Sequence, residues 1–437
     1  MNTEQLTVAI VGGGLSGLSA ATYLARAGVQ VTLFEKAAHP GGRAASQRYQ
    51  GYSLNRGSHA FYSGGSASEV LRELNITYPY SSPAAGDLFL LEQGRFEPFP
   101  ATAGTMVRTK ALDLLDKLEL MRVLATFSTA GTAHISVQEW IQQSFRRPQN
   151  RYLIAAIART YTYSDALDLV SAEVFIDKLR RSLFHPVHYI QHGWQTLVDA
   201  LQAQAERYGA QIKSGTRVTG LVREGNRVQG VRLSDGRVFS ADAVIVATTP
   251  KEAARIIDVP SFQTLADSLL PARLATVEVA LSRQPVQEHT IVQSLDHPVF
   301  MSVQSHYTEV APKGAALITA FKQLSPIKAT DPEQDLQDLE AVLDAAQPGW
   351  REVQVKKIYL PHIETVGTLP LARSGGFAGR PDYRLPELTN LYLAGDWVGS
   401  EGFATDASLA SARRVSRLIL QAGSSLYAEQ RQLSLAR

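Results

Sequence analysis

Three closely spaced glycines, Gly12, Gly14 and Gly17, have the spacing at which a polypeptide backbone can approach a phosphate group. Gly12 permits a tight turn, Gly14 lets the backbone come close to a pyrophosphate, and Gly17 lets a following helix pack closely on the preceding strand. Leu15 and Ser16 lie between them, where the first turn of that helix would present free N–H groups and a positive dipole end. The chemistry that this pattern predicts is the binding of a dinucleotide.

The elements that must position these glycines are indicated on both sides of them. Residues 7–11, T-V-A-I-V, are a short apolar run typical of a buried parallel strand, and residues 18–27 contain good helix formers. Residues 29–35 indicate a second strand that ends in an acid, Glu35. A carboxylate at this distance from the glycines is predicted to accept hydrogen bonds from an adenosine ribose, with Lys36 beside it.

A second glycine pair, Gly41 and Gly42, is followed directly by Arg43. This segment resembles the G-G-R segment of the glutathione-reductase-type flavoproteins, in particular the branch that contains the amine oxidases and carotenoid desaturases. The resemblance implies that the paired glycines pass the diphosphate of FAD closely and that Arg43 supports its charge. The expected cofactor is therefore FAD rather than NAD.

The C-terminal part of the chain carries a second resemblance. Residues 390–394, N-L-Y-L-A, indicate a buried strand, and the following G-D-W-V-G-x-x-G-x-A is similar to the flavin motif of the desaturases and hydroxysqualene-processing enzymes. The resemblance implies that Asp396 accepts hydrogen bonds from the ribityl chain and that a helix from about Ala404 directs its N–H groups at the flavin. The other residues assigned to the cofactor are Val218 on a strand near the adenine, Thr248 at the end of a buried strand, and Gly395, Gly402 and Phe403 in the C-terminal motif.

The candidate catalytic residue is His59, in the segment Gly57-Ser58-His59-Ala60-Phe61-Tyr62. This segment resembles the G-x-H-x-F-F segment of the plant-type phytoene and zeta-carotene desaturases. The resemblance implies that Gly57, Ser58 and His59 lie near the flavin, where a histidine can place substrate or move a proton. The alternative is a polar histidine satisfied by the backbone of a glycine-rich loop.

The composition excludes several other classes of protein. The 437 residues include 43 basic and 41 acidic residues, a formal net charge of +2, which argues against nucleic acid as a partner. There is no cysteine, which excludes disulfides, thiolate metal ligands and a cysteinyl link to flavin. The first six residues are polar and no run of eighteen apolar residues occurs, so neither a signal peptide nor a transmembrane helix is expected. We expect a cytoplasmic protein, with peripheral contact to a membrane left open.

The predicted fold class is α/β, with a discontinuous Rossmann-type FAD-binding domain and an inserted α+β substrate domain of mixed sheet and helices. The FAD-binding domain is assigned to residues 1–75, 191–270 and 366–437, and the substrate-binding domain to residues 76–190 and 271–365. Within the insert, helices over 111–127 and 151–180 can face either the core or a membrane surface. Residues expected to line the substrate pocket are Tyr62, Tyr161, Tyr189, Phe300, His306 and Phe403.

No metal site is predicted, although three histidines crowd one stretch of the chain. They are His185, His188 and His192, and Pro186 breaks any helical pairing among them. No carboxylate joins them, so the pattern favours histidines in caps and strands over a metal centre.

The resemblance implies an FAD-dependent dehydrogenase or desaturase that acts on a small apolar, isoprenoid or carotenoid-like substrate by hydride transfer to the flavin. One alternative is a flavin amine oxidase, for which Lys313 and Lys322 are the lysine candidates in the expected stretch. A second alternative is a prenyl- or lipid-binding protein of the GDP-dissociation-inhibitor type. We expect non-covalent FAD, with a histidyl link through His39 or His59 left open. The sequence does not identify the electron acceptor.

Overall fold

A five-stranded parallel sheet carries the first glycine motif. The computed structural model describes residues 5–55, 57 and 59–435, with side chains described as far as residue 423. The strand order is β10-β2-β1-β14-β20, and every neighbouring pair is parallel. The strands are β1 (Thr7–Val11), β2 (Gln30–Phe34), β10 (Gln211–Lys213), β14 (Ala243–Val246) and β20 (Leu391–Leu393). The predicted strand–turn–helix–strand unit is therefore confirmed, and the α/β fold class with it.

Both faces of this sheet are covered, which explains its continuous apolar runs. On one face, Val8 and Ile10 of β1 pack against helices, whereas on the other face Ala9 and Val11 belong to a separate cluster. The helices are α1 (Leu15–Arg26), α8 (Gln195–Arg207) and the long C-terminal α12 (Thr405–Leu435). The opposite face is covered by the antiparallel strands β11 (Val218–Glu224), β12 (Arg227–Leu233) and β13 (Val238–Ser240), and by α9 (Pro250–Ile257) and α10 (Pro260–Ser268).

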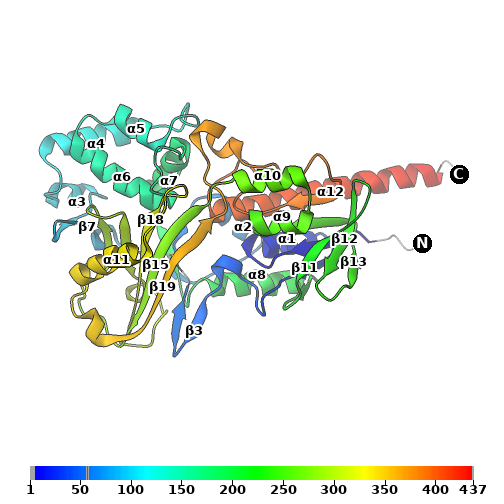
Figure 1. The fold of residues 1–437 in the computed structure, drawn as a ribbon, viewed down its shortest axis with the longest axis horizontal. Coiled ribbons are helices and arrows are strands. Elements are labelled where there is room, and N and C mark those ends of the chain that lie inside the picture. The colour runs from blue at the N-terminus through cyan, green and yellow to red at the C-terminus, as the bar shows by residue number, and fades with distance from the viewer. Residues whose placement is uncertain (1–4, 56, 58, 436–437) are drawn as a thin grey trace.

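A seven-stranded mixed sheet is the second large sheet of the molecule, and it lies beside the parallel sheet in Figure 1. Its order is β19-β15-β18-β17-β16-β7-β8, with antiparallel neighbours except β16 and β7, which run parallel. Helix α11 (Pro332–Ala346) packs on one of its faces. The strands are β7 (Leu88–Glu92), β8 (Arg95–Pro98), β15 (Ala272–Leu281), β16 (Ile291–Ser294), β17 (Val299–Val303), β18 (Ala316–Leu324) and β19 (Gln354–Val366).

Five consecutive helices, which follow β8 in the chain, form a helical subdomain. Side-chain caps begin four of them, because Thr102, Asp113, Ser136 and Ser171 each accept a hydrogen bond from a backbone N–H in the first turn. Their apolar faces share one core with residues of the seven-stranded sheet, among them Leu90, Leu274 and Phe321. The helices are α3 (Ala103–Arg108), α4 (Leu114–Thr126), α5 (Val137–Ser144), α6 (Pro148–Thr162) and α7 (Ala172–Phe184).

Short elements connect the two parts of the molecule. Helix α2 (Ser66–Glu73) packs against α12, and β9 (Val187–Ile190) pairs with two short strands of the N-terminal region. Those strands are β5 (Phe61–Tyr62) and β6 (Tyr80–Ser81), and β3 (Gln47–Tyr49) pairs with β4 (Tyr52–Leu54). Among the helices of the described residues, none combines the length and the apolar character that crossing a bilayer requires.

Candidate functional site

A cavity of about 740 Å³ lies where the carboxyl ends of the parallel strands face the seven-stranded sheet. This is the position at which open α/β sheets bind their ligands. Residues of β15 and β19, including Glu278 and Ile363, form its other wall. The predicted cofactor residues that line it are Gly12, Gly14, Leu15, Ser16, Glu35, Lys36, Gly41, Gly42, Arg43, Gly57, His59, Val218, Thr248, Gly395, Asp396 and Ala404.

The three glycines of the first motif have three different environments. Gly12 has φ +106°, and a Cβ there would lie 2.5 Å from the carbonyl oxygen of Ala247. A Cβ on Gly17 would lie 1.9 Å from the carbonyl oxygen of Gly12, so this glycine allows α1 to touch the turn. A Cβ on Gly14 would meet no protein atom within 4 Å, so the bare backbone at Gly14 faces the cavity. Gly12 thus permits the turn, Gly17 permits the contact between α1 and the turn, and Gly14 leaves the backbone open to a ligand in the cavity.

The second glycine pair rests directly on the first motif. The N–H of Gly41 donates to the carbonyl oxygen of Gly13 over 2.8 Å, and a Cβ on Gly42 would lie 3.6 Å from the Cα of Gly14. Both glycines have positive φ, +133° and +55°. The two motifs thus form one continuous backbone floor, which has the shape that a diphosphate requires.

Glu35 is buried at the end of β2, beside this floor. Its two carboxylate oxygens accept hydrogen bonds from the N–H groups of Gly13 and Ala37, both over 2.7 Å. These bonds fix the carboxylate at the cavity wall, and each oxygen keeps a lone pair for a ribose hydroxyl. The geometry therefore fits the predicted ribose contact.

Arg43 and Asp396 form an ion pair on the cavity wall. Two parallel bonds of 2.7 and 2.8 Å join the guanidinium to the two carboxylate oxygens. Arg43 also donates to the carbonyl oxygen of Thr365, and Asp396 accepts from the N–H of Gly367 over 3.1 Å. The sequence assigned the two residues to different parts of FAD, whereas the structure shows that they position each other.

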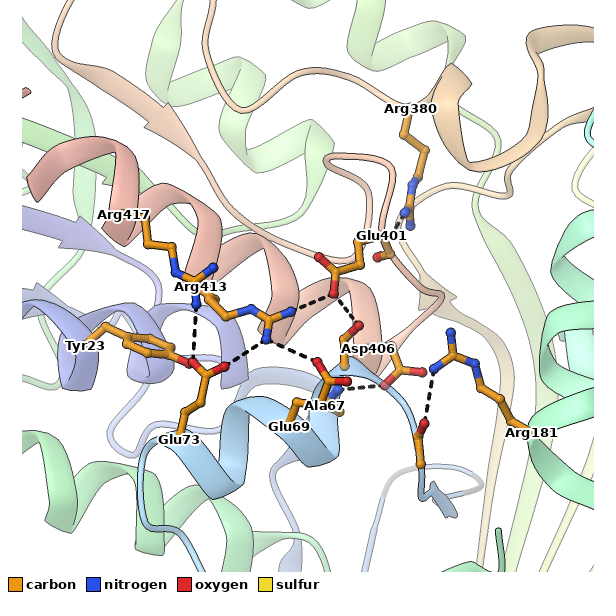
Figure 2. A network of polar contacts seen from close by, with 12 residues as sticks. Tyr23, Ala67, Glu69, Glu73, Arg181, Arg380, Glu401, Asp406, Arg413 and Arg417 are labelled. Atoms are coloured by element: carbon orange, nitrogen blue, oxygen red, sulfur yellow. Dashed lines mark hydrogen bonds and ion pairs between the residues drawn. The ribbon is translucent and has the colours of Figure 1, made fainter. Parts of the chain in front are cut away.

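The start of α12 is held in place by a network of charged side chains (Figure 2). Arg413 donates to the carboxylates of Glu69, Glu73 and Glu401 over 2.7–3.3 Å, which ties α12 to α2. Asp406, in the first turn, accepts from the N–H of Ala67 over 2.8 Å. Because Ala404, Thr405 and Ser408 line the cavity, this network fixes the helix end that the sequence assigned to the flavin.

Three of the assigned cofactor residues do not line the cavity, and a fourth is not described. Gly17 supports the turn, Gly402 packs against Asp406 in the first turn of α12, and Phe403 lies in an aromatic cluster. Ser58 lies outside the described residues. Gly17, Gly402 and Phe403 therefore lie behind the residues that line the cavity and support them.

His59 lines the cavity, but both of its ring nitrogens are engaged by backbone. Nδ1 lies 2.9 Å from the carbonyl oxygen of Gly57, and Nε2 lies 3.0 Å from that of Arg43. The ring also contacts Trp194 edge-on, and burial lowers the pKa of His59 below its usual value. Neither nitrogen points at open space, which favours the alternative of a backbone-satisfied histidine. The catalytic role of His59 stays a prediction.

An aromatic cluster on the far side of the cavity wall surrounds a lysine that the sequence analysis did not single out. The ammonium nitrogen of Lys178, on α7, lies 4.0, 4.3 and 5.4 Å from the ring centroids of Tyr62, Tyr163 and Phe403. It donates to the carbonyl oxygen of Tyr161 over 3.0 Å. We call these five residues the Lys178 cluster. Because Tyr163 also lines the cavity, the cluster borders the cofactor site.

The charge of Lys178 is poorly compensated. Only 7% of the residue is exposed, and no carboxylate among the described residues lies within ion-pair distance of its nitrogen. Burial therefore lowers the pKa of Lys178 to about 7, against the opposing field of Asp406. A sequence signal existed, since Val174, Phe175 and Lys178 share one face of α7 at helical spacing.

The other predicted pocket residues are divided between this cluster and the neighbouring sheet. The Tyr161 ring contacts that of Tyr62, and Phe300 contacts Phe321. Tyr189 accepts a hydrogen bond from Ser302 and stacks on Tyr307. His306 is exposed, with its ring against Tyr307, so the structure does not bring it to the Lys178 cluster as a pocket wall.

The two lysines considered for an amine oxidase occupy other environments. Lys322 donates to the carboxylates of Asp335 and Asp338, and Lys313 is exposed in a loop. The crowded histidines also separate, since His188 stacks on Tyr80 and His192 faces Glu309. Within the described residues, no group of three or more His, Asp or Glu side chains is arranged to hold a metal ion.

Comparison with known proteins decides the family. The model of flavin-containing amine oxidoreductases matches residues 15–420, nearly the whole chain. The chain belongs to this family. It is therefore a flavin oxidoreductase of the amine oxidase type, and the predicted family and enzyme class are confirmed.

Two curated relatives show which activities occur among similar sequences. The chain is 24% identical to coproporphyrinogen III oxidase of Propionibacterium freudenreichii subsp. freudenreichii, over 78% of this chain and 76% of the relative. It is also 24% identical to 4,4'-diapolycopen-4-al dehydrogenase of Metabacillus indicus, over 89% of this chain and 92% of the relative. At this identity the flavoprotein oxidoreductase class is shared, and the substrates are properties of the relatives.

Solved structures support the fold. An oxidoreductase from Methanosarcina mazei matches with a TM-score of 0.76 and 19% identity, over 94% of this chain and 100% of that one. Putrescine oxidase matches at 0.71 and 15%, over 95% and 99%. A Rab GDI from Plasmodium falciparum matches at 0.62 and 13%, over 94% and 98%. Because a putrescine oxidase and a Rab GDI both share this fold, the fold alone does not select a function.

Proposed function

We propose that this flavoprotein is an FAD-dependent dehydrogenase or desaturase of an apolar, isoprenoid or carotenoid-like substrate. The observation that carries the proposal is the Lys178 cluster, where the protein's own ammonium group occupies the space among the aromatic rings. The proposal is supported by the family and by the carotenoid-processing relative. When bound, FAD supplies the chemistry, because its ring accepts a hydride equivalent from carbon and passes the electrons on.

The residues present fit a non-covalent FAD. The floor made by Gly14 and Gly42 offers bare backbone to a diphosphate, and Glu35 stands at the ribose position. Of the two histidines considered for a covalent link, His39 is exposed and outside the cavity lining, and both nitrogens of His59 face carbonyl oxygens. Without cysteine, the chain has no thiol for such a link.

The chain's own groups then bind, orient and exclude water. The ion pair of Arg43 and Asp396 presents a preformed polar edge along one side of the cavity. The N-terminus of α12 supplies a positive dipole end near Ala404, which favours negative charge on a bound ring. The stacked rings of Tyr163 and Phe403 shield the side of the cavity next to the Lys178 cluster from solvent. A substrate without polar groups requires such a shielded, apolar wall.

The amine oxidase alternative is less well supported by the same cluster. Aromatic cages attract ammonium groups, but here Lys178 already makes the cation–π contacts. With a pKa of about 7, Lys178 is about half protonated at neutral pH, and in its charged form it repels a second ammonium group in this buried region. We therefore rank amines below apolar substrates.

The lipid-binding alternative, without flavin chemistry, is also less well supported. A protein that had lost its cofactor would have no requirement for a bare glycine at Gly14, a positioned carboxylate at Glu35 and the Arg43–Asp396 pair in one cavity. The structural match to a Rab GDI shows a shared fold and carries no argument for its function.

The test is flavin reduction in the absence of oxygen. The purified protein, reconstituted with FAD, is mixed with phytoene in detergent or with putrescine or benzylamine, and the visible flavin band is followed. We expect phytoene to bleach the band and the amines to leave it unchanged; reoxidation by oxygen or by a quinone then identifies the acceptor. Bleaching by an amine alone would overturn the substrate class, and failure to bind FAD would overturn the cofactor and favour lipid binding.

A further inference from the structure

The outer face of α4 exposes apolar side chains that no other element of the described residues covers. Leu114, Leu115 and Leu118 are 70, 58 and 50% exposed, and Met121 is 47% exposed. At 3.6 residues per turn these four positions fall within a stripe about 120° wide. The inner face of α4 is apolar as well, since Leu120 and Val123 are buried in the helical subdomain. A solvated helix normally carries polar residues on its outer face, so the exposed stripe needs a partner.

The short helix α3 extends this surface. Its C-terminal carbonyl groups, those of Val107 and Thr109, accept hydrogen bonds from Lys117 of α4 over 3.2 and 2.8 Å. Val107 is highly exposed beside this junction. We call the exposed side chains of Val107, Leu114, Leu115, Leu118 and Met121 the α3–α4 face.

The α3–α4 face is bordered by unpaired positive charge. Arg108, Lys110 and Arg122 are exposed, and within the part of the chain that the structure describes none of them forms an ion pair with a carboxylate. The nearby acids are already engaged, because Asp113 and Asp116 pair with Arg147. Glu119, in turn, accepts hydrogen bonds from the N–H of Arg146 and from Asn150. Arg108, Lys110 and Arg122 are therefore exposed cations beside the apolar stripe without an ion pair among the described residues, although the charge of Glu119 acts on Arg122 and the carboxylate of Glu97 accepts from the N–H of Lys110.

The position of this face in the molecule suits contact with a large flat partner. In Figure 1, α3 and α4 lie at the end of the molecule opposite to the C-terminal end of α12. By contrast, α6 and α7, which the sequence also offered as surface helices, carry many side chains into the helical core. Tyr152 of α6 and Leu183 and Phe184 at the end of α7 are exposed as well, but the region around residues 111–127 carries the longer stripe of exposed apolar side chains.

We propose that the α3–α4 face docks on the surface of a lipid bilayer that contains anionic lipids. The leucines of α4 enter the headgroup region, and Arg108, Lys110 and Arg122 pair with the anionic headgroups around them. An amphipathic helix with an apolar stripe and a basic border binds such interfaces through burial of apolar surface and through electrostatic attraction to the anionic headgroups. The inference does not depend on the redox substrate, although a membrane would be a natural source of an apolar one.

The first experiment is co-sedimentation of the full-length, FAD-loaded protein with vesicles. Vesicles of phosphatidylcholine alone are compared with vesicles that also contain phosphatidylserine, at low and high NaCl. We expect binding to the anionic vesicles that weakens as salt rises, because the Debye length falls. Equal binding to both vesicle types at both salt concentrations, or no binding to either, would overturn the proposal.

Two variants separate the apolar and charged contributions. The triple substitution Leu114→Ser, Leu115→Ser and Leu118→Ser is expected to abolish sedimentation with vesicles while leaving FAD content unchanged. Neutralising Arg108, Lys110 and Arg122 to Gln is expected to lower the partition constant roughly 100-fold, because each basic residue near an anionic surface contributes about 1 kcal/mol, or about fivefold. The single variant Leu115→Ser gives a milder change if the triple variant folds poorly.

Matched controls use equally exposed residues elsewhere. Ile327 and Val238 are 58 and 50% exposed, so Ile327→Ser with Val238→Ser should leave vesicle binding unchanged. The charge control replaces three exposed cations that lie on other elements, Arg283, Lys313 and Lys328, with Gln. Loss of binding in either control would contradict a specific α3–α4 face. A concentration-dependent dimer by light scattering, abolished by the leucine variant, would instead assign the face to a second copy of the chain and overturn the proposal.

Discussion

Arg43 and Asp396, separated by 353 residues in the chain, are joined by two parallel hydrogen bonds of 2.7 and 2.8 Å. The first follows the second glycine pair, and the second follows the last parallel strand. Each fixes the orientation of the other at the cavity wall, and the N–H of Gly367 adds a third contact to the carboxylate. Two motifs at opposite ends of the sequence are thus one structural unit.

Replacing Asp396 with alanine is expected to weaken FAD binding about 10- to 100-fold, because a charged hydrogen-bond partner contributes about 1.5–3 kcal/mol. The measurement is the dissociation constant from quenching of FAD fluorescence. Asp382→Ala is the control, since Asp382 is exposed in the same C-terminal region and bonds only locally, to the N–H of Arg384. Unchanged FAD affinity of the Asp396 variant would show that our placement of this residue is wrong.

Alanine at Gly14 and at Gly17 should have opposite consequences. At Gly14 the new Cβ meets only the cavity, so FAD binding is expected to fall while the apo-protein loses at most about 1 kcal/mol, the preference of an N-cap for glycine. At Gly17 the Cβ collides with the carbonyl of Gly12, so the apo-protein itself should lose about 1–3 kcal/mol or more. Thermal unfolding followed by circular dichroism, with and without FAD, distinguishes the two; equal effects would contradict the assigned environments.

Lys178→Met should stabilise the protein in a pH-dependent way. The pKa of Lys178 is about 7 in the folded chain, against 10.5 for an ordinary lysine. Between these values the unfolded chain binds more protons, so the stability of the wild-type protein rises with pH through this window. Below pH 7 both states are protonated and the cost of burying the charge is complete, on the order of 5 kcal/mol. The gain in free energy of unfolding from Lys178→Met should therefore be largest below pH 7 and shrink toward pH 10.

Lys322→Met is the matched control for this prediction. Lys322 holds the carboxylates of Asp335 and Asp338, so removing its charge leaves two negative groups facing each other. We expect this variant to be less stable than wild type at neutral pH, the opposite sign to Lys178→Met. Urea unfolding at several pH values measures both, and a destabilised Lys178 variant would contradict the unpaired state of that lysine.

His59→Ala is expected to lower FAD content more than it slows reduction of the flavin that remains bound. The reason is that the ring lies between the carbonyl oxygens of Gly57 and Arg43 and donates its one N–H to one of them, so the side chain holds the cavity wall in place. FAD content comes from the visible spectrum, and the rate per bound flavin from anaerobic mixing with substrate. A large fall in that rate at unchanged FAD content would restore the catalytic role predicted from the sequence.

The local sequence pattern was sufficient to predict features that a single segment of the chain forms by itself. The spacing of Gly12, Gly14 and Gly17 predicted a turn, a ligand contact and a helix contact; the turn and the helix contact are present, and Gly14 leaves its backbone open to the cavity. Such features depend on steric rules within a few residues, so they can be recognised without knowing the rest of the fold. The same holds for Glu35 at the end of β2, because a strand fixes where its last side chain lies.

Local pattern was insufficient where the partner comes from a distant segment. His306 had the residue type of a pocket wall, yet it is exposed in the short helical turn after β17, with its ring against Tyr307. His59 had the sequence context of a catalytic group, but the carbonyl of Arg43 that engages it belongs to another loop. Neither outcome follows from residue type or spacing.

The sequence by itself determined the glycine turn, the parallel strands that carry it and, through two resemblances, the flavoprotein family. Only the tertiary structure decided that Arg43 pairs with Asp396, that Lys178 lies among Tyr62, Tyr163 and Phe403, and that the outer leucines of α4 are left uncovered. The physical reason is that backbone conformation responds to near neighbours, whereas the burial and charge state of a side chain depend on which distant surfaces pack against it.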